Sequence, residues 1–293
     1  MQPLVEIVIV NYNGYEDTIE CLRSLNKITY ENYQTVVVDN GSTKQPTEEQ
    51  IRFIKEHAIY LKSEENRGFA GGNNYGVACT RELKPDYLLL LNNDTEVCEG
   101  FLEKLVETAQ AKPDAGIVCG KINWYDEKDQ VWFGGGVFDP KTCYVSHTNC
   151  GKDLDNSNYV MPIEFSTGCM QLIPLHVWQQ VGPMDERFFL YAEDLDFCRL
   201  VRNAGYQIYY RNDAKIFHKV SRSTGRDSDN TQYYYVRNEL YIIQRYATNK
   251  PLAYGVKMAR FAMDILKRRK RIIPVLAGIL DFCKGIDGQR RSK

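Results

Sequence analysis

The chain has 293 residues, of which 43% are hydrophobic and 21 are glycine. This is the composition of a globular protein with a sizeable core, and it excludes a wholly disordered, collagenous or coiled-coil chain. No apolar run reaches the roughly 18 residues of a spanning helix, so we expect none. The first residues, MQPLVEIVIVNYNG, lack the basic region of a signal peptide.

The net charge of −1 is split unevenly along the chain. Residues 250–293 hold 12 lysines and arginines against 3 acidic residues, whereas residues 1–249 hold 25 against 35. A basic tail on an acidic body predicts an anionic partner, either a membrane or a nucleic acid. The 9 cysteines form no CxxC pair and are odd in number, which favours free thiols in a reducing cytosol.

The first half of the chain alternates short apolar runs with longer amphipathic segments. The apolar runs predict strands at Val5–Val10, Thr35–Asp39, Ile59–Lys62, Tyr87–Asn92 and Ala115–Cys119. The segments between them predict helices at Thr18–Leu25, Thr47–His57, Gly72–Thr80 and Gly100–Ala111. Continuous apolar strands separated by helices indicate an α/β fold whose parallel sheet is covered on both faces.

The second half is less regular. Residues 121–160 are aromatic and rich in glycine, which predicts irregular strands and loops, and residues 164–173 predict one strand. Glu193–Asn203 predicts a helix that stops at Gly205, and Gln207–Tyr210 predicts a strand after it. From about residue 230 the pattern is helical. We therefore divide the chain into a catalytic domain, 1–229, and a helical, basic extension, 230–293.

Polar clusters follow three of the predicted strands, where α/β sheets bind ligands. They are Asn11-Tyr12-Asn13-Gly14, Asp39-Asn40-Gly41-Ser42 and Asn92-Asn93-Asp94. Asp39 can accept a hydrogen bond from a base or a ribose hydroxyl, or it can form a turn. Asp94 supplies the kind of oxygen that binds a divalent cation on a diphosphate, or it can cap a helix.

A glycine-rich loop, Glu65-Asn66-Arg67-Gly68-Phe69-Ala70-Gly71-Gly72-Asn73-Asn74, precedes a predicted helix. Its N–H groups and Arg67 can hold an anion, although it matches neither common phosphate-binding motif. The alternative is a plain turn between a strand and a helix.

Three carboxylates, Glu193, Asp194 and Asp196, follow the aromatic run FFLYA. One of them can serve as a general base, or all three can stabilise a helix N-terminus. His218 ends a predicted strand, which favours a ligand role over packing. The other histidines, His57, His147 and His176, predict structural roles.

Taken together, the motifs resemble the inverting nucleotide-sugar glycosyltransferases of family 2, which have the GT-A fold. The matching segments are VIVNYNG, VVVDNGS, ENRGFAGGNN, LLLLNNDTEV, FFLYAEDLDFCRL, FHKVSRSTG and YYYVRNEL, in the family's order over about residues 5–240. Within the family the chain looks most like bacterial rhamnosyltransferases that build surface polysaccharides.

The resemblance implies a role for each matching residue. Asp194 is the expected catalytic base, and a divalent cation, Mg²⁺ or Mn²⁺, is expected on Asp94 and His218. The residues expected to bind the nucleotide sugar are Asn11, Tyr12, Asp39, Arg67, Asn93 and Glu193. The sequence departs from the family at Asn92, where the first acid of the metal motif is an amide. The loss of one carboxylate predicts a weaker, less charged metal site, completed by the donor diphosphate and water.

The expected donor is thymidine diphosphate rhamnose, with a uridine diphosphate hexose or galactofuranose as the alternative. Two other classes stay open: a sugar nucleotidyltransferase, whose early triphosphate-binding loop residues 9–24 lack, and a non-catalytic sugar- or lipid-binding homologue. The sequence leaves the oligomeric state open.

The basic tail predicts a partner as well. On a helical projection of Tyr254–Leu266, an apolar face contains Tyr254, Met258, Phe261, Ala262, Ile265 and Leu266, and an opposite face contains Lys257, Arg260, Lys267 and Arg268. Either this helix packs on the catalytic domain, or it lies on the anionic cytoplasmic leaflet near a polyprenyl diphosphate acceptor. Nucleic acid is not expected, because the body is acidic. We therefore expect a cytoplasmic protein, peripheral on the cell membrane.

Overall fold

The computed structural model describes residues 2–155, 157–220 and 228–290. Its strands are β1 (Val5–Asn11), β2 (Tyr33–Asn40), β3 (Ile59–Ser63), β4 (Tyr87–Leu91), β5 (Thr95–Val97), β6 (Ala115–Trp124), β7 (Gln130–Phe133), β8 (Gly136–Asp139), β9 (Tyr144–His147), β10 (Gly151–Lys152), β11 (Val160–Ile163), β12 (Met170–Pro174) and β13 (Gln207–His218). Its α-helices are α1 (Tyr15–Leu25), α2 (Glu48–His57), α3 (Gly68–Cys79), α4 (Phe101–Ala111), α5 (Leu175–Val181), α6 (Glu193–Asn203), α7 (Asp229–Tyr246), α8 (Lys250–Leu266) and α9 (Ile272–Cys283), with a short 3₁₀ helix at Arg81–Leu83.

Within the described residues, one 11-stranded sheet forms the centre of the fold, and the order of its main path is β10-β7-β6-β12-β4-β1-β2-β3. Strands β3, β2, β1 and β4 are mutually parallel, and β12 then pairs antiparallel with β4. The predicted α/β fold with a central, mostly parallel sheet and flanking helices is confirmed. The central strands β1 and β4 are mostly apolar and buried, which is why continuous hydrophobic runs predicted them, whereas the edge strand β3 is only partly buried.

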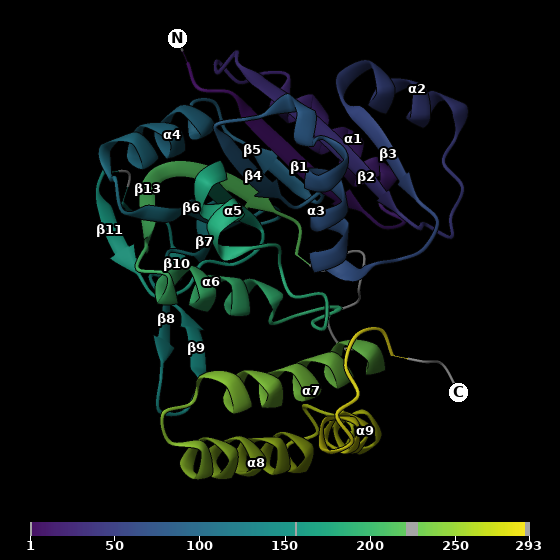
Figure 1. Ribbon diagram of the computed structural model, residues 1–293, viewed down its shortest axis with the longest axis vertical. Coiled ribbons are helices and arrows are strands. Elements are labelled where there is room, and N and C mark those ends of the chain that lie inside the picture. The colour runs from purple at the N-terminus through teal and green to yellow at the C-terminus, as the bar shows by residue number, and fades with distance from the viewer. Residues whose placement is uncertain (1, 156, 221–227, 291–293) are drawn as a thin grey trace.

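The lower part of the molecule is a layer of three helices, α7, α8 and α9, which Figure 1 shows beneath the sheet. Figure 1 also shows the two-stranded β8–β9 sheet extending from the main body towards α7. Hydrogen bonds fix this contact: the Thr248 N–H donates to the Pro140 carbonyl at 2.9 Å. Apolar side chains of α7 and α8, among them Val236 and Phe261, belong to the same core as the sheet. The helical tail is confirmed, while the boundary at residue 230 stays a prediction.

Two predicted elements differ from the structure. The strand expected over 164–173 begins only at Met170, as β12. Residues 164–169 form a loop instead, because this segment turns towards the α6 N-terminus, where the Gly168 N–H donates to Asp194. The strand expected at Gln207–Tyr210 continues to His218 through a shift in register after Arg211. The helix at Glu193–Asn203 is confirmed at both ends.

The face predicted for the tail helix is partly wrong. Phe261 is buried as expected, but Ala262 and Leu266 are exposed. Lys257, expected in solvent, is 5% exposed, because Glu239 on α7 accepts a hydrogen bond from its Nζ at 2.8 Å. The side of α8 that packs is therefore the line Ala253–Lys257–Phe261, which follows the four-residue spacing of one helix face.

All nine cysteines lie in the described ranges and are free thiols, as the composition favoured. Across those same ranges, no helix is both long and apolar enough to cross a membrane.

Candidate functional site

A cleft of about 1650 Å³ lies at the carboxyl edge of the parallel strands. One side, which we call the amino-terminal wall, is lined by Val10, Tyr12, Asn40, Asn93 and Asp94. The opposite side, the carboxyl-terminal wall, is lined by Tyr191, Glu193, Asp194 and Tyr235. The sheet thus brings most of the predicted site residues to one cavity.

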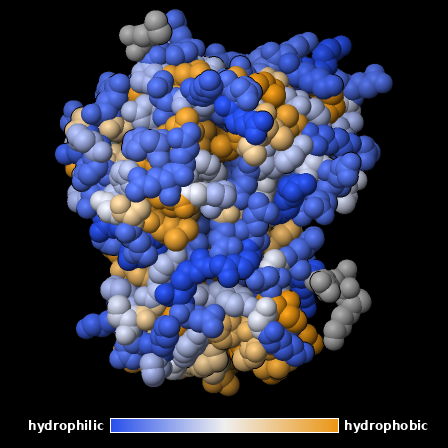
Figure 2. All heavy atoms as spheres, viewed as in Figure 1, coloured by the Kyte–Doolittle hydropathy of each residue, from blue (hydrophilic) through white to orange (hydrophobic). Residues whose placement is uncertain are grey.

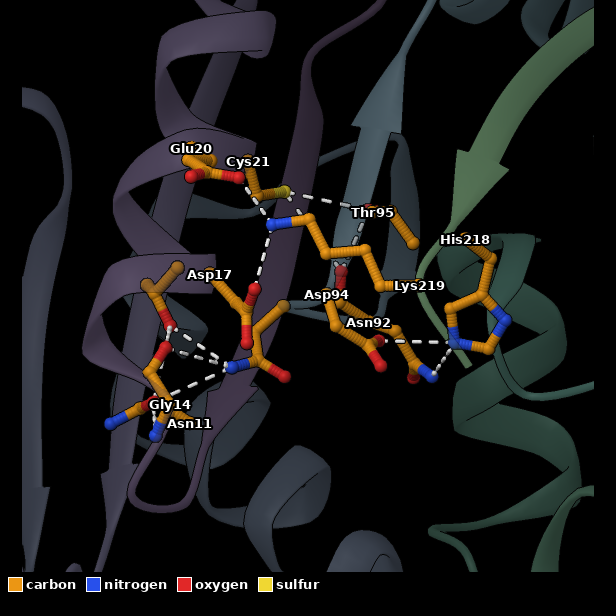
Figure 3. Close-up of polar contacts among 12 residues, drawn as sticks. Asn11, Gly14, Asp17, Glu20, Cys21, Asn92, Asp94, Thr95, His218 and Lys219 are labelled. Carbon is orange, nitrogen blue, oxygen red and sulfur yellow. Dashed lines mark hydrogen bonds and ion pairs between the residues drawn. The ribbon is translucent and has the colours of Figure 1, made fainter. Parts of the chain in front are cut away.

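Asn11 organises the start of the amino-terminal wall although its own side chain is buried. Its Oδ1 accepts hydrogen bonds from the Gly14 N–H at 3.0 Å and the Thr18 hydroxyl at 3.1 Å. Figure 3 shows this network beside β1. Asn93 joins it, because its Nδ2 lies 3.1 Å from the Thr18 Oγ1 and 3.4 Å from the Asn11 Oδ1. The two amides therefore shape the loop after β1, and Asn93 and Tyr12 line the cleft.

Asp39 is 1% exposed at the end of β2. Its Oδ2 accepts hydrogen bonds from the hydroxyls of Tyr15 and Tyr60, each at 2.9 Å, and its Oδ1 accepts from the Ser42 N–H at 3.2 Å. This carboxylate already has three donors inside the protein. A direct contact between Asp39 and a base stays a prediction, and its neighbour Asn40 is the residue of β2 that lines the cleft.

The glycine-rich segment joins the two walls, and it is a loop only up to Arg67, because the residues from Gly68 on form the first turns of α3. Gly68 has a φ of +72°, and a Cβ there would lie 2.0 Å from the Phe189 carbonyl oxygen, so only glycine fits. The next N–H, that of Phe69, donates to the same carbonyl at 3.0 Å. Arg67 points elsewhere: its Nε donates to the Ser63 hydroxyl at 2.9 Å, and its guanidinium lies over the Tyr75 ring. Asn66 and Phe69 line the cleft in its place.

Asp94 and His218 both line the cleft, and their side chains point towards one another (Figure 3). The His218 Nε2 lies 3.0 Å from the Asp94 Oδ1 and 3.4 Å from the Asn92 Nδ2. The two residues are 6% and 5% exposed, and the His218 Nδ1 has no hydrogen-bond partner among the described residues.

This pair carries opposite charges. Burial opposes the charged form of His218, but Cys169 and Asp94 outweigh it and raise its pKa to about 10. Burial likewise opposes ionisation of Asp94, yet His218 lowers its pKa. A carboxylate oxygen and an imidazole nitrogen nevertheless converge on one point. A divalent cation would bind there in place of the imidazole proton, because only the neutral ring has a free electron pair. No group of three or more His, Cys, Asp or Glu with metal-ligand geometry occurs within residues 2–155, 157–220 and 228–290.

Lys219 fixes this strand end to α1, and sequence analysis did not single it out. Its Nζ donates to Asp17 at 2.6 Å and also to Glu20, while its main-chain N–H donates to the Asp94 carbonyl at 3.0 Å. Figure 3 shows the lysine crossing from β13 to the helix that carries both acids. The charge of the Lys219 ammonium is thereby neutralised by two carboxylates, so we assign Lys219 a positioning role for Asp94.

Glu193 and Asp194 open α6 on the carboxyl-terminal wall, and their surroundings differ. The Asp194 Oδ2 accepts from the Gly168 N–H at 3.0 Å, and its Oδ1 accepts from the Leu195 N–H at 2.8 Å. Glu193 is 6% exposed, and its Oε2 has no partner among the described residues. Burial raises the pKa of Asp194, although hydrogen bonds from these two N–H groups act to lower it. Burial and the Asp194 charge raise the pKa of Glu193 well above its usual range.

This contrast separates the two acids chemically. Glu193 holds its proton more tightly, and Asp194 is the carboxylate suited to accept one. Asp196 takes no part in the cleft, because it is fully buried and paired with Arg245 and Tyr246.

Sequence reasoning missed several aromatic residues that line the cleft. They are Phe69, Trp124, Trp132, Phe165, Phe189, Tyr191 and Tyr235. The only available signal was the aromatic character of the segments around them. His147, expected to be structural, does pack against the rings of Trp132 and Phe133, but it lines the cleft as well.

Comparison with known proteins defines the class. A model of glycosyl transferase family 2 matches residues 6–173, which is more than half of the chain. The chain therefore belongs to glycosyl transferase family 2, an enzyme family. Two solved structures share the fold at 14% identity: the mannosyltransferase PcManGT from Pyrobaculum calidifontis with GDP-Man and Mn²⁺ (TM-score 0.58, covering 97% of this chain and 80% of that one), and GalNAc-T7 with UDP, GalNAc and Mn²⁺ (TM-score 0.61, covering 91% and 58%). The predicted GT-A fold is confirmed.

Proteins related in sequence indicate which members of the family the chain resembles. The chain is 31% identical to glycosyltransferase GlyG of Streptococcus pneumoniae over 44% of this chain, and the match spans only 42% of GlyG. It is 25% identical to the N-acetylglucosaminyl-diphospho-decaprenol L-rhamnosyltransferase of Mycobacterium tuberculosis, over 78% of this chain and 80% of that protein. It is 22% identical to the dTDP-rhamnosyl transferase RfbF of Shigella flexneri, over 99% of both. The expected likeness to rhamnosyltransferases is confirmed.

Proposed function

We propose that this chain transfers a sugar, L-rhamnose in the first instance, from a nucleoside diphosphate donor to a saccharide acceptor with inversion at the anomeric carbon. One observation carries the proposal: the Asp94–His218 pair and Asp194 line the same cleft of a family 2 fold. The donor binds along the amino-terminal wall, near Asn11, Tyr12, Asn93 and the glycine-rich loop.

The reaction is a single in-line displacement. Asp194 takes the proton of an acceptor hydroxyl while that oxygen attacks the anomeric carbon from the face opposite the nucleotide. The new C–O bond forms as the bond from that carbon to the diphosphate oxygen breaks, and the nucleoside diphosphate leaves with the electron pair. The Gly168 and Leu195 N–H groups hold the base in place, and Glu193 binds sugar hydroxyls.

Asp94 and His218 are the residues that would hold a divalent cation, Mg²⁺ or Mn²⁺. Their buried oxygen and nitrogen atoms, 3.0 Å apart, fit such an ion, and both structural neighbours contain Mn²⁺. Bound there, the cation would supply positive charge that offsets the charge developing on the leaving diphosphate. Because Asn92 is uncharged, this site depends more on the donor diphosphate than a site with two carboxylates.

The proposed donor, thymidine diphosphate rhamnose, is supported by the names of the two rhamnosyltransferase relatives, and a uridine diphosphate hexose or galactofuranose is the alternative. The proposed acceptor is a saccharide on a lipid diphosphate, as the name of the M. tuberculosis relative states for that protein. This reaction belongs to surface polysaccharide synthesis at the cytoplasmic face of the membrane.

An exposed surface of α8 and α9 supports docking on an anionic membrane. Its apolar members, 45–79% exposed, are Leu252, Val256, Met263, Leu266, Ile272, Ile273, Leu276 and Leu280. The basic run Lys267–Arg271 lies between the two helices. Figure 2 shows apolar side chains gathered over the lower end, where Figure 1 places α8 and α9. Apolar groups beside a basic cluster suit a bilayer with anionic lipids, and we call these residues the extension surface.

A panel of nucleotide sugars tests the proposed function. Thymidine diphosphate rhamnose, uridine diphosphate hexoses and uridine diphosphate galactofuranose are each titrated with and without Mn²⁺, and transfer to a lipid-diphosphate saccharide is followed by mass spectrometry. We expect one donor to dominate and the product to have the inverted anomeric configuration by NMR. A retained configuration, or no transfer from any donor, contradicts the proposal.

A further inference from the structure

Two tyrosines from distant parts of the chain stack beside the carboxyl pair. The rings of Tyr191 and Tyr235 have centroids 4.0 Å apart and planes inclined by 12°. Tyr235 lies on α7 between buried neighbours, yet it is 42% exposed and lines the cleft together with Glu193 and Asp194. The extension thus places an aromatic surface next to the proposed base.

The tyrosine pair is held in a fixed position. Tyr191 and Ala192 both have positive φ angles, +67° and +73°, which residues other than glycine rarely adopt. Asn238 on α7, fully buried, donates from its Nδ2 to the carbonyls of Leu190 at 2.9 Å and Tyr191 at 2.8 Å. The same helix therefore supplies one ring and holds the backbone that carries the other.

The groups around this pair match the chemistry of a sugar ring. A pyranose has an apolar C–H face, which packs on aromatic rings, and hydroxyl groups at its edge, which need polar partners. Glu193 and Glu239 line the cleft nearby, and the Glu193 Oε2 has no partner among the described residues. The Tyr191 ring covers one face of Tyr235, and the Lys270 ammonium lies 5.9 Å from the centroid of the Tyr235 ring. A sugar that stacks on the remaining face therefore has to displace this long side chain.

We propose that Tyr191 and Tyr235 form the acceptor subsite, on which the acceptor pyranose stacks so that its hydroxyl faces Asp194. The Lys270 ammonium, displaced from the Tyr235 ring, would then pair with a phosphate attached to that sugar. The proposal rests on the proposed function, and it adds that the extension contributes directly to acceptor binding.

The test compares Tyr235→Ala, Tyr235→Phe and a matched control, Tyr241→Ala. Tyr241 lies on the same helix, but it packs against Phe282 and does not line the cleft. The probe is N-acetylglucosamine diphosphate on a short alkyl chain. We expect Tyr235→Ala to raise the KM for the probe about tenfold, the usual size of an aromatic stacking contribution, with kcat and donor Kd within about threefold. Tyr235→Phe and Tyr241→Ala should stay within about twofold of the parent.

NMR of the probe adds a readout that needs no turnover. Its ring C–H signals should shift upfield on binding to the parent and to Tyr235→Phe, and not on binding to Tyr235→Ala. An unshifted spectrum with the parent, or an equal rise of KM in Tyr241→Ala, overturns the subsite. A parent that binds and shifts the probe but transfers no sugar to it contradicts the proposed function instead.

Discussion

The two walls of the cleft differ in how their buried polar groups are hydrogen-bonded. On the amino-terminal side, Asn11 and Asp39 are buried, and each meets several partners within the protein. On the carboxyl-terminal wall, Glu193 is equally buried but keeps one oxygen without a partner among the described residues, and the preceding two residues have positive φ. The polar groups at the ends of β1 and β2 are thus satisfied within the fold, whereas Glu193 holds a carboxyl oxygen that a ligand can satisfy.

This difference suggests separate tasks. Paired amides and a buried carboxylate make a rigid frame, which suits binding a nucleotide in one pose. Strained backbone and unpaired carboxyl oxygens cost free energy, so they persist only where the surrounding fold holds them. Such features cluster at functional sites. We therefore expect changes in the carboxyl-terminal wall to affect catalysis more than donor binding.

The largest effect should come from Asp194→Asn. Loss of a general base costs about 10²–10⁴-fold in rate, while donor Kd, measured by calorimetry, should stay within about twofold. Because burial raises the pKa of Asp194, and the base must be ionised, the parent's rate should fall as pH drops through that pKa. The variant should lack this acidic limb.

Glu193→Gln is the matched control, since the change removes the neighbouring acid and leaves the base. Near-normal turnover of Asp194→Asn together with an inactive Glu193→Gln would move the base to Glu193. Asp196 is no longer a candidate, because its carboxylate is buried against Arg245, away from the cleft.

Metal removal should have the next largest effect, and it acts at the amino-terminal wall. We expect excess chelator to stop transfer and Mn²⁺ to restore it. Asp94→Ala or His218→Ala should raise the Mn²⁺ concentration for half-maximal activity at least tenfold, because each supplies one of the two protein ligands. His57→Ala, on α2 outside the cleft, is the control for loss of a histidine. Full activity in chelator would mean that protein N–H groups alone stabilise the leaving group.

The sequence allowed one wall to be predicted better than the other, for a physical reason. Parallel strands end at a common edge, so polar residues at the ends of β1 and β4 had to meet there, and Asn11 and Asn93 do so. Arg67 was expected at the ligand, but Ser63 and the Tyr75 ring hold it outside the cleft. Local pattern does not reveal which of several nearby partners a long side chain will choose.

The carboxyl-terminal wall depends on contacts between remote segments. The start of α6 was predicted correctly, since its acids suit a helix N-terminus. That Tyr235 and Asn238 come from α7 to complete the wall follows only from how the helical layer packs. Lys257 shows the same limit, because its burial requires Glu239 on a different helix.

Vesicle binding by the extension surface would show whether the layer of helices α7, α8 and α9 also holds the enzyme at a membrane. Lys267, Arg268 and Arg269 are exposed, and each should contribute about 1 kcal/mol of attraction to anionic lipid at low salt. Changing all three to Gln should therefore lower partitioning onto phosphatidylglycerol vesicles by about 100-fold, and salt should weaken the parent's binding. Co-sedimentation measures both effects.

A charge-matched variant with Lys27, Lys44 and Arg81 changed to Gln removes three exposed charges from the amino-terminal part of the chain, outside the extension. It should bind the vesicles like the parent. Soluble acceptors should still be used by both variants, while lipid-borne acceptors should suffer only in the first. Unchanged vesicle binding by the first variant would make the basic run structural.

The smallest effect, and the most specific to the comparison, is expected from Asn238→Ala. This buried amide holds the carbonyls of Leu190 and Tyr191, so its loss should cost about 1–3 kcal/mol of stability and loosen the turn before Glu193. Asn212→Ala is a close match, because Asn212 is also buried and donates to two carbonyls, those of Asp155 and Ser157, at 3.1 and 2.8 Å. Denaturant unfolding should show similar losses for both. Only Asn238→Ala should lower kcat, by about tenfold with donor Kd unchanged, since only that amide controls where α6 presents Asp194. Equal kcat values in the two variants would mean that the positive-φ turn holds its shape without α7, and that the walls differ in chemistry but not in how they are supported.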